Sequence, residues 1–257
     1  MAGKMVHFVG AGPGAVDLIT VRGQRFLREA DVIIYAGSLV NPELLHEAKE
    51  DCAIYNSAHM TLEEVIAVME DSEKSGLMTV RLHTGDPSIY GAIREQMDVL
   101  DQKGIAYDVC PGVSAFCGAA AALSMEYTLP EISQSVIITR ASGRTLVPQL
   151  ESIESFAKHQ ATMVLFLSTG LLGEVTRQLL LGGYKKDTPA AIVYKATWPE
   201  EETHVCTVGT LEETALAFGI TKTALIIVGE AVRQTGYDRS KLYDPEFSTE
   251  YRKAKDE

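Results

Sequence analysis

Short apolar runs rich in β-branched residues alternate along the chain with stretches whose apolar residues recur at helical spacing. In the first half, five runs have the composition of buried strands, at residues 5–9, 32–35, 53–55, 78–82 and 107–109. The stretches between them favour amphipathic helices. Strands that alternate with helices predict a parallel sheet covered by helices on both faces.

The helix expected after residue 60 has the clearest start signal. Thr61 and Glu64 have the spacing of a capping box, in which each side chain satisfies a backbone N–H at the start of the helix. The apolar residues that follow fall on one helical face: Leu62, Val65, Ile66 and Met69.

The pattern is interrupted at residues 127–133, where Pro130 and several polar residues follow a helix of small residues. A second set of strands is expected at residues 135–139, 163–167, 190–194, 204–208 and 224–228. Helices fit residues 147–158, 171–181 and 212–218. We therefore predict two α/β domains, residues 1–123 and 124–257. The second ends in a polar tail after Val232, and we expect this tail to cover a surface or a partner subunit.

Composition narrows the class of protein. Hydrophobic residues make up 46% of the 257 residues and charged residues 23%, as in globular domains. The net charge of −12 argues against a nucleic-acid binder, which needs a basic surface. No apolar run approaches the roughly 18 residues of a membrane span, and none resembles a signal peptide, so we expect a cytoplasmic protein that does not contact a membrane.

The cysteines give no sign of a metal site. Cys52, Cys110, Cys117 and Cys206 form no CxxC pair, and no histidine lies at zinc-like spacing from them. We expect four reduced thiols, packed as small apolar groups, and no bound metal.

The loop after the first strand contains Gly10, Gly12 and Ala15, which match the loose dinucleotide fingerprint GxGxxG/A. Two features argue against a nicotinamide site. Pro13 removes a backbone N–H from the loop that would hold a pyrophosphate. The second strand also lacks the expected acidic residue at its end, where Ala36 follows Tyr35.

Two more loops of similar chemistry follow the fourth and fifth strands. One contains Gly85 and Asp86, and the other contains Gly112 and Ser114. Asp86 suits either hydrogen bonding to a ligand or a structural turn, and Ser114 suits either ligand contact or helix capping. Since ligands of open α/β sheets bind at the carboxyl ends of the strands, the three loops together predict one ligand cleft.

These loops resemble those of a known family. The segments Val9–Gly14 with Asp17 and Leu18, Gly85–Pro87, and Pro111–Ala115 are similar in order and spacing to the tetrapyrrole (corrin/porphyrin) methyltransferases. Further segments resemble the precorrin-4 C11-methyltransferases within that family: residues 35–42, 60–64, 139–145, 195–201 and 237–243.

The resemblance implies two α/β domains with the ligand cleft between them, a homodimer, and S-adenosylmethionine (SAM) as methyl donor. It implies methylation of a tetrapyrrole at C11 of precorrin-4 or cobalt-precorrin-4, in cobalamin biosynthesis. The SAM contacts that it implies are Pro13, Thr84, Gly85, Asp86, Ile89, Ser114, Ala115, Ser168 and Ala196. The uroporphyrinogen-methylating relatives differ, because they have an Asp where this chain has Ala36 and a Lys near Tyr55–Ser57.

The substrate of such an enzyme has many carboxylates, and three residues suit them. Arg140 and Arg144 flank a Ser-Gly turn and have guanidinium groups able to bind carboxylates in a bidentate way. Ser38, after the second strand, could donate a further hydrogen bond. His59 and His83 are assigned to loops near the cleft, and for each a hydrogen-bonded structural or surface role is favoured over a catalytic one. No residue is identified as the catalytic base.

Two other functions remain open from the sequence. One is a SAM-dependent methyltransferase of the same fold that acts at another corrin position, on a diphthamide precursor or on ribosomal RNA; the acidic charge disfavours RNA. The other is a module that binds a tetrapyrrole or SAM without catalysis. Trp198, the only tryptophan, is expected to pack at the domain interface and is assigned no chemistry.

Overall fold

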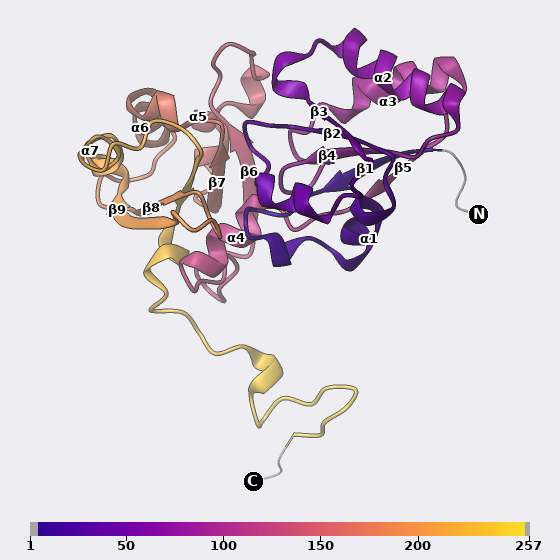
Figure 1. The fold of residues 1–257 in the computed structure, drawn as a ribbon. Helices are drawn as coiled ribbons and strands as arrows, with labels where there is room; N and C mark the ends of the chain where they lie inside the picture. Colours follow the sequence, from indigo (N-terminus) through magenta and orange to yellow (C-terminus); the bar gives the residue numbers. More distant parts are fainter. Residues whose placement is uncertain (1–4, 255–257) are drawn as a thin grey trace. The chain divides into compact units, whose positions relative to one another are not determined.

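The chain folds into two compact units, seen in Figure 1, a computed structural model that describes residues 5–254. The first unit contains the chain up to Ala119 together with the short segment Lys195–Glu201. The second contains Ala120–Tyr194 and the chain from Glu202 onward. The chain thus leaves the second unit after residue 194, contributes seven residues to the first, and returns.

The first unit is built on a parallel five-stranded sheet of order β3-β2-β4-β1-β5. Its strands are β1 (Val6–Gly10), β2 (Val32–Tyr35), β3 (Ala53–Asn56), β4 (Thr79–His83) and β5 (Tyr107–Cys110). Its helices are α1 (Val21–Glu29), α2 (Leu62–Ser75) and α3 (Ile93–Lys103), and α4 (Ala115–Ala122) begins in it. The predicted parallel sheet is confirmed, with every strand within a residue of its expected position.

Helices cover both faces of this sheet, as Figure 1 shows, with α1 on one side and α2 and α3 on the other. The alternation of side chains along β1 explains the two layers: Phe8 packs in the cluster with α2 and α3, and Val9 packs in the cluster with α1. The predicted capping box of α2 is also confirmed. Thr61 Oγ1 accepts from the Glu64 N–H at 3.3 Å, and the Glu64 carboxylate accepts from the Thr61 N–H at 2.7 Å.

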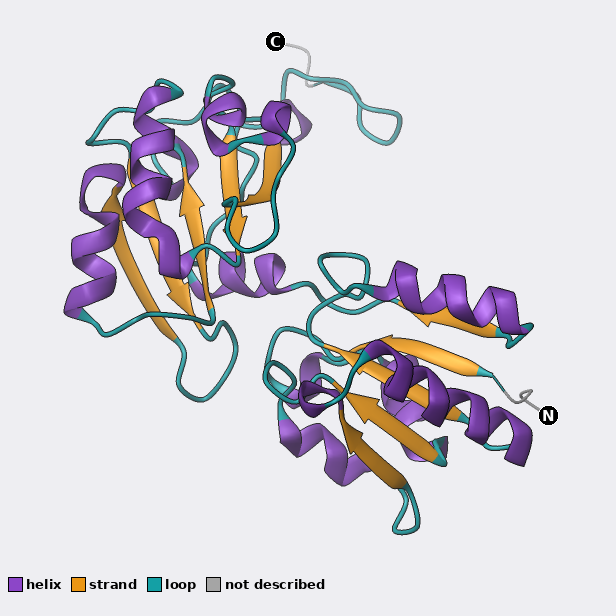
Figure 2. Cartoon of the chain, turned by 90° about the horizontal axis from the view of Figure 1, so that it is seen from above, coloured by secondary structure: helices purple, strands orange, loops and turns teal. Residues whose placement is uncertain are grey.

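The second unit has a mixed sheet of order β6-β7-β10-β8-β9. Its strands are β6 (Val136–Arg140), β7 (Thr162–Phe166), β8 (Pro189–Tyr194), β9 (Glu202–Thr207) and β10 (Ala224–Val228). Only β6 and β7 pair in parallel, and the other pairs are antiparallel. The α/β class predicted for both halves is therefore confirmed. Figure 2 shows strands and helices in each unit.

Three helices of the second unit, α5 (Ile153–Ala157), α6 (Leu172–Leu181) and α7 (Leu211–Ala217), contribute buried residues to one core. The helix expected over residues 147–158 is shorter than predicted. The Ser152 hydroxyl accepts from the Ser155 N–H at 3.2 Å and caps α5 at its first turn. Only a single 3₁₀ turn, Gln149–Glu151, precedes that cap.

The tail of the second unit exposes its aromatic side chains. Tyr243 is 72% exposed and Tyr251 is 96% exposed. The segment folds back on itself, since Arg252 donates to the main-chain carbonyls of Leu242 and Asp244 at 2.9 and 2.5 Å. Within residues 5–254, no helix has the length and apolar character needed to cross a membrane.

Candidate functional site

Three glycine-containing loops lie against one another at the carboxyl edge of the first sheet. They follow β4, β1 and β5, which are neighbours in the parallel sheet and therefore end at the same edge. Ala11 donates its N–H to the His83 carbonyl at 2.7 Å, and Gly12 and Gly85 exchange two main-chain hydrogen bonds of 3.2 and 2.8 Å. The structure thus brings together the three loops that the sequence predicts to form one site.

The loops approach so closely that their contacts exclude side chains. A Cβ atom on Gly10 would lie 2.6 Å from Gly112 Cα and 2.6 Å from the Gly85 carbonyl oxygen. A Cβ atom on Gly112 would lie 2.2 Å from the same oxygen. Real Cβ atoms essentially never come within 3.0 Å of a heavy atom outside their own and the adjacent residues, so only glycine fits these positions. The loops form a cradle made of backbone, which suits close approach of a ligand.

Asp86 joins two of these loops. Its Oδ2 accepts from the Gly112 N–H at 2.9 Å, and its Oδ1 accepts from the Ser88 N–H at 2.8 Å and from the Ser88 hydroxyl. Partial burial pushes the pKa of Asp86 upward. The hydrogen bonds from the Ser88 side chain and from the amides of Gly112 and Ser88 outweigh that effect, so the pKa lies below its ordinary value. The carboxylate therefore acts as a charged clamp between the loops.

The backbone beyond Asp86 is strained. Tyr90 and Ala92 have φ angles of 55° and 50°, in the left-handed region that favours glycine. Gly91 lies between them, and a Cβ atom there would come within 2.1 Å of the Pro87 carbonyl oxygen. Such strain costs about 1–2 kcal/mol per residue and is concentrated in proteins at ligand sites. The predicted contact Ile89 lies at the start of this strained turn.

The remaining contacts predicted in the first half of the chain border the same cradle. Thr84 directly follows β4 and is half-buried. Pro13 is buried in the first glycine loop. The Ser114 carbonyl accepts from the Cys117 and Gly118 amides at 3.0 and 3.3 Å, which places Ser114 immediately before α4, and Ala115 is the first residue of that helix.

His83 is not a loop residue as predicted but the last residue of β4, and only 5% of it is exposed. Burial, followed by the positive charge of Arg81, lowers the pKa of His83 to about 3. Its Nε2 atom has no hydrogen-bond partner among the described residues. His83 is therefore a neutral imidazole at physiological pH, and its low pKa makes it too weakly basic to suit a general base. His59, also assigned to a loop, is exposed in a 3₁₀ turn, Ser57–His59.

The segment Lys195–Glu201 is bound to the first glycine loop. Trp198 Nε1 donates to the Pro13 carbonyl at 3.1 Å, and Thr197 Oγ1 accepts from the Ala15 N–H at 3.0 Å. The indole lies directly against Gly14 of this loop, since a Cβ atom on Gly14 would be 2.1 Å from Trp198 Cδ1. These contacts place Ala196, a predicted SAM contact, in the same unit as the cradle.

The sequence interpretation missed the residues that hold the glycine loop from outside. Trp198 was assigned no chemistry, although it is the only tryptophan in the chain. Asn41 was missed as well: it is buried, donates from Nδ2 to the Gly14 carbonyl at 2.9 Å, and accepts from the Glu43 N–H. The signal that could have identified Asn41 is its place directly before Pro42, at the end of the segment 35–42 that carries part of the family resemblance.

The second unit contains Ser168 and Arg140, both at the carboxyl edge of the parallel pair β6–β7. The Ser168 side chain is fully buried, accepts from the Ala141 N–H at 2.8 Å and donates to the Phe166 carbonyl at 2.6 Å. Arg140 donates to main-chain carbonyls of its own loop, including that of Thr145 at 2.9 Å. Both side chains thus shape the loops in which they lie.

Arg144 and Ser38 are exposed. Arg144 forms no hydrogen bond or ion pair with any residue in the described range 5–254. Its guanidinium therefore differs from that of Arg140 in being available to an anion. Ser38 follows β2 in the first unit, next to Gly37, where a Cβ atom would be 2.1 Å from Asn56 Oδ1.

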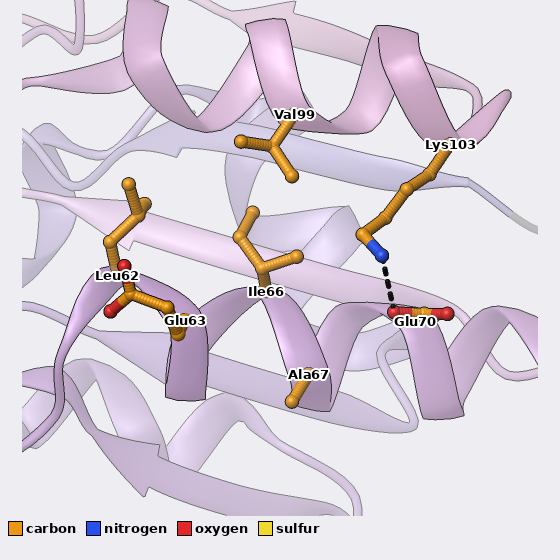
Figure 3. A pocket seen from close by; sticks show the side chains of 7 residues that line it. All are labelled: Leu62, Glu63, Ile66, Ala67, Glu70, Val99 and Lys103. Carbon is orange, nitrogen blue, oxygen red and sulfur yellow. Dashed lines mark ion pairs between the residues drawn. The ribbon is translucent and has the colours of Figure 1, made fainter.

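A pocket elsewhere in the first unit contains none of the predicted site residues. Figure 3 shows it between α2 and α3, where Leu62, Ile66 and Val99 form an apolar lining. An ion pair of 2.9 Å between Lys103 Nζ and Glu70 lies beside them. Across residues 5–254, no group of three or more His, Cys, Asp or Glu side chains is arranged to hold a metal ion.

Comparison with known proteins identifies the family. A model of the family described as Tetrapyrrole (Corrin/Porphyrin) Methylases matches residues 5–212. Among curated proteins, the chain is 51% identical to a cobalt-precorrin-4 C(11)-methyltransferase of Methanocaldococcus jannaschii, over 98% of this chain and 97% of that one. It is 42% identical to a precorrin-4 C(11)-methyltransferase of Pseudomonas aeruginosa, over 96% of this chain and 98% of that one.

Solved structures agree with these relatives. A cobalamin biosynthetic enzyme, cobalt precorrin-4 methyltransferase, matches with a TM-score of 0.87 and 44% identity, over 89% of this chain and 95% of that one. A uroporphyrin-III C-methyltransferase from Thermus thermophilus, in complex with S-adenosylhomocysteine, matches with a TM-score of 0.74 and 25% identity, over 91% of this chain and 96% of that one.

Proposed function

Because the chain belongs to the tetrapyrrole (corrin/porphyrin) methylases, we propose that it is a SAM-dependent methyltransferase acting on C11 of precorrin-4 or cobalt-precorrin-4 in cobalamin biosynthesis. The reaction and position are those in the names of relatives 51% and 42% identical over nearly the whole chain. The structural observation that supports methyl-donor binding most strongly is the backbone cradle of Gly10, Gly85 and Gly112.

The donor site that we propose consists of the residues inferred from the family resemblance. They are Pro13, Thr84, Gly85, Asp86, Ile89, Ser114, Ala115, Ser168 and Ala196. The chemistry of the first unit fits such a donor. Its loops offer backbone amides and carbonyls with little side-chain bulk, and no step of the proposed reaction requires a metal.

Bound SAM supplies a methyl group on a positively charged sulfur. The nucleophile is an electron-rich ring carbon of the tetrapyrrole; its new bond to the methyl carbon forms as the methyl–sulfur bond breaks, and the electron pair of that bond stays on sulfur. The protein contributes alignment, which is worth about 7–11 kcal/mol in well-oriented reactions. In this chain the clamp of Asp86 and the contacts of Trp198 hold the donor loops in place.

The substrate residues that we propose are Ser38, Arg140 and Arg144. Arg144 is exposed and unpaired among the described residues, so its guanidinium suits a bidentate contact with a substrate carboxylate. Arg140 contributes by shaping the loop, because it donates to the Thr145 and Leu146 carbonyls at 2.9 and 3.1 Å.

The strongest alternative is methylation at another corrin position by the same fold. A uroporphyrinogen-III C-methyltransferase of Bacillus subtilis is 32% identical over 90% of this chain, which spans 49% of that protein. Ala36 and Tyr55–Ser57 favour the C11 reaction over that one, because the uroporphyrinogen-methylating relatives have an Asp and a Lys at these places.

We further propose that the enzyme is a cytoplasmic homodimer that binds neither nucleic acid nor a membrane. The net charge of −12 supports the lack of nucleic-acid binding. Light scattering on the purified protein tests the dimer, which should have about twice the chain mass of 27.9 kDa. A single-chain mass would contradict it.

Product analysis tests the function. The purified enzyme is incubated with SAM labelled in its methyl carbon and with precorrin-4 or cobalt-precorrin-4 in parallel, and NMR locates the labelled methyl. We expect it on C11. Transfer to another ring carbon would support the alternative, and S-adenosylhomocysteine binding without turnover of either substrate would contradict the proposed reaction.

A further inference from the structure

The short segment Lys195–Glu201 is strained on both sides of Ala196. Lys195 and Thr197 have φ angles of 45° and 69°, in the left-handed region. This conformation is especially unfavourable for a β-branched residue such as Thr197. Ala196 between them is 7% exposed. The surrounding contacts must stabilise this conformation, since a free segment would relax to ordinary backbone angles.

Within the segment, three hydrogen bonds hold the strained backbone. The Thr197 N–H donates to the Glu201 carboxylate at 2.6 Å, the Trp198 N–H donates to the Lys195 carbonyl at 2.9 Å, and the Glu201 N–H donates to the Trp198 carbonyl at 3.0 Å. These bonds keep the turn closed but do not attach it to the glycine loop.

Attachment to the glycine loop depends on Trp198 and Thr197. The indole N–H donates to the Pro13 carbonyl at 3.1 Å, and the ring covers Gly14 so closely that a Cβ atom there would lie 2.1 Å from Cδ1. The Thr197 hydroxyl accepts from the Ala15 N–H at 3.0 Å. Pro13 is itself a proposed donor contact, so one side chain holds two parts of the donor site together.

We propose that Trp198 is a positioning residue for methyl-donor binding, which fixes Ala196 and the Pro13 loop in their binding conformation. This inference rests on the proposed function. Trp198 acts through the backbone of these neighbours and requires no contact of its own with the tetrapyrrole. Its loss should therefore weaken binding of SAM and its product and leave the affinity for the tetrapyrrole unchanged.

The first test is W198F, which keeps a six-membered aromatic ring but removes the indole N–H and the rest of the five-membered ring. We expect the Kd for S-adenosylhomocysteine, measured by calorimetry, to rise about three- to tenfold, as for the loss of one hydrogen bond. The KM for SAM should rise with it, while the KM for the tetrapyrrole stays constant. The matched control is Y184F, which removes one side-chain hydrogen bond to a main-chain carbonyl, that of Ala161, in the second unit. This control should lower the melting temperature without changing the Kd.

A double-mutant cycle tests the contact from the loop side. G14A should displace the indole and weaken S-adenosylhomocysteine binding, whereas in a W198A background the same change should add little, because the collision is gone. Additive effects would overturn the inference. If G14A alone is unstable because its added methyl group collides with the indole, the double variant remains informative, because it lacks the indole.

Fluorescence gives an independent signal, because the chain contains one tryptophan and its emission reports on Trp198 alone. We expect saturating S-adenosylhomocysteine to change this emission in the wild type. The positioning role would be overturned if S-adenosylhomocysteine leaves the emission of the wild type unchanged and W198F binds it with the same Kd as the wild type. The proposed function would remain intact. A wild type that binds no S-adenosylhomocysteine would overturn both.

Discussion

Replacing Asp86 by asparagine tests whether the carboxylate clamps together the two glycine loops that follow β4 and β5. In the wild type, three donors converge on it, namely the Gly112 N–H and the N–H and hydroxyl of Ser88. Asparagine has nearly the same shape but only one oxygen, so its NH₂ group must face one of these donors. At least one hydrogen bond to a charged group is lost and one donor is left unsatisfied.

The size of the effect follows from that loss. A hydrogen bond to a charged group contributes about 1.5–3 kcal/mol. Because Asp86 is only partly buried, solvent screening favours the lower part of this range. We therefore expect D86N to lower the free energy of unfolding of the first unit by about 2 kcal/mol. Since the Gly112 loop loses its anchor, the Kd for S-adenosylhomocysteine should rise about tenfold, or about 1.4 kcal/mol.

The pH dependence of the unfolding free energy tests whether the negative charge of Asp86 stabilises the folded protein. The folded-state pKa of Asp86 lies below the ordinary value of 3.8, so the unfolded chain binds this proton more readily. Its stabilising contribution is fully present above about pH 5 and is lost as the pH falls through the folded-state pKa. The difference in stability between wild type and D86N should therefore shrink below pH 4. Urea unfolding at a series of pH values measures it.

The control for this experiment is D98N in the same unit. Asp98 forms an exposed ion pair with Arg94, of the kind that contributes about 0–1 kcal/mol, and it lies on α3 away from the glycine loops. D98N should leave the Kd unchanged. The clamp hypothesis is refuted if D86N unfolds at the same urea concentration as the wild type while its affinity falls. That result would make Asp86 a direct ligand contact without a clamping role.

Three further changes test other parts of the site. R144A should raise the KM for the tetrapyrrole about 10- to 100-fold, the range for one charged hydrogen bond, with SAM affinity constant; R177A, which breaks an exposed ion pair, is the kinetic control. G112A should lose S-adenosylhomocysteine binding and about 1–3 kcal/mol of stability through overpacking, whereas G170A, with no atom closer than 4.0 Å, should bind normally. H83F should unfold no more easily than the wild type at pH 7, since it removes an unpartnered buried nitrogen. Below pH 6.5, H83F should become more stable relative to the wild type. In the wild type the unfolded chain then binds a proton at His83, whereas the folded protein binds it only near pH 3, so protonation favours unfolding.

Much of the first unit could be predicted because its signals are local. Its buried strands are short apolar runs, and α2 has a complete capping box that the sequence shows directly. Parallel neighbours then bring the loops after β1, β4 and β5 to one edge without further information. That Gly10, Gly85 and Gly112 lie at the same edge of the sheet is predictable for this reason, although the contacts between them are not.

Other features depend on contacts between residues far apart in the chain, and no local pattern shows these. The bond from Trp198 to Pro13 joins residues 185 positions apart. His83 reads as a loop residue because histidine precedes Thr84 and Gly85, yet pairing with Gly10 extends β4 through it. The free guanidinium of Arg144 and the engaged one of Arg140 likewise look equivalent in the sequence.

Three side chains around the glycine loops share one property: each bonds to the main chain of a neighbouring loop. Asp86 binds the Gly112 amide, Asn41 binds the Gly14 carbonyl, and Trp198 binds the Pro13 carbonyl. A cradle of glycine backbone cannot hold its own shape, because glycine has the greatest conformational freedom in the unfolded chain. These side chains restrict that freedom, so we expect stability and affinity for the proposed donor to depend on the same bonds. Across variants at these three positions, the loss of unfolding free energy should therefore increase with the loss of S-adenosylhomocysteine affinity. Variants of Arg144, an exposed residue of the proposed substrate site, should instead change the affinity for the tetrapyrrole at constant stability.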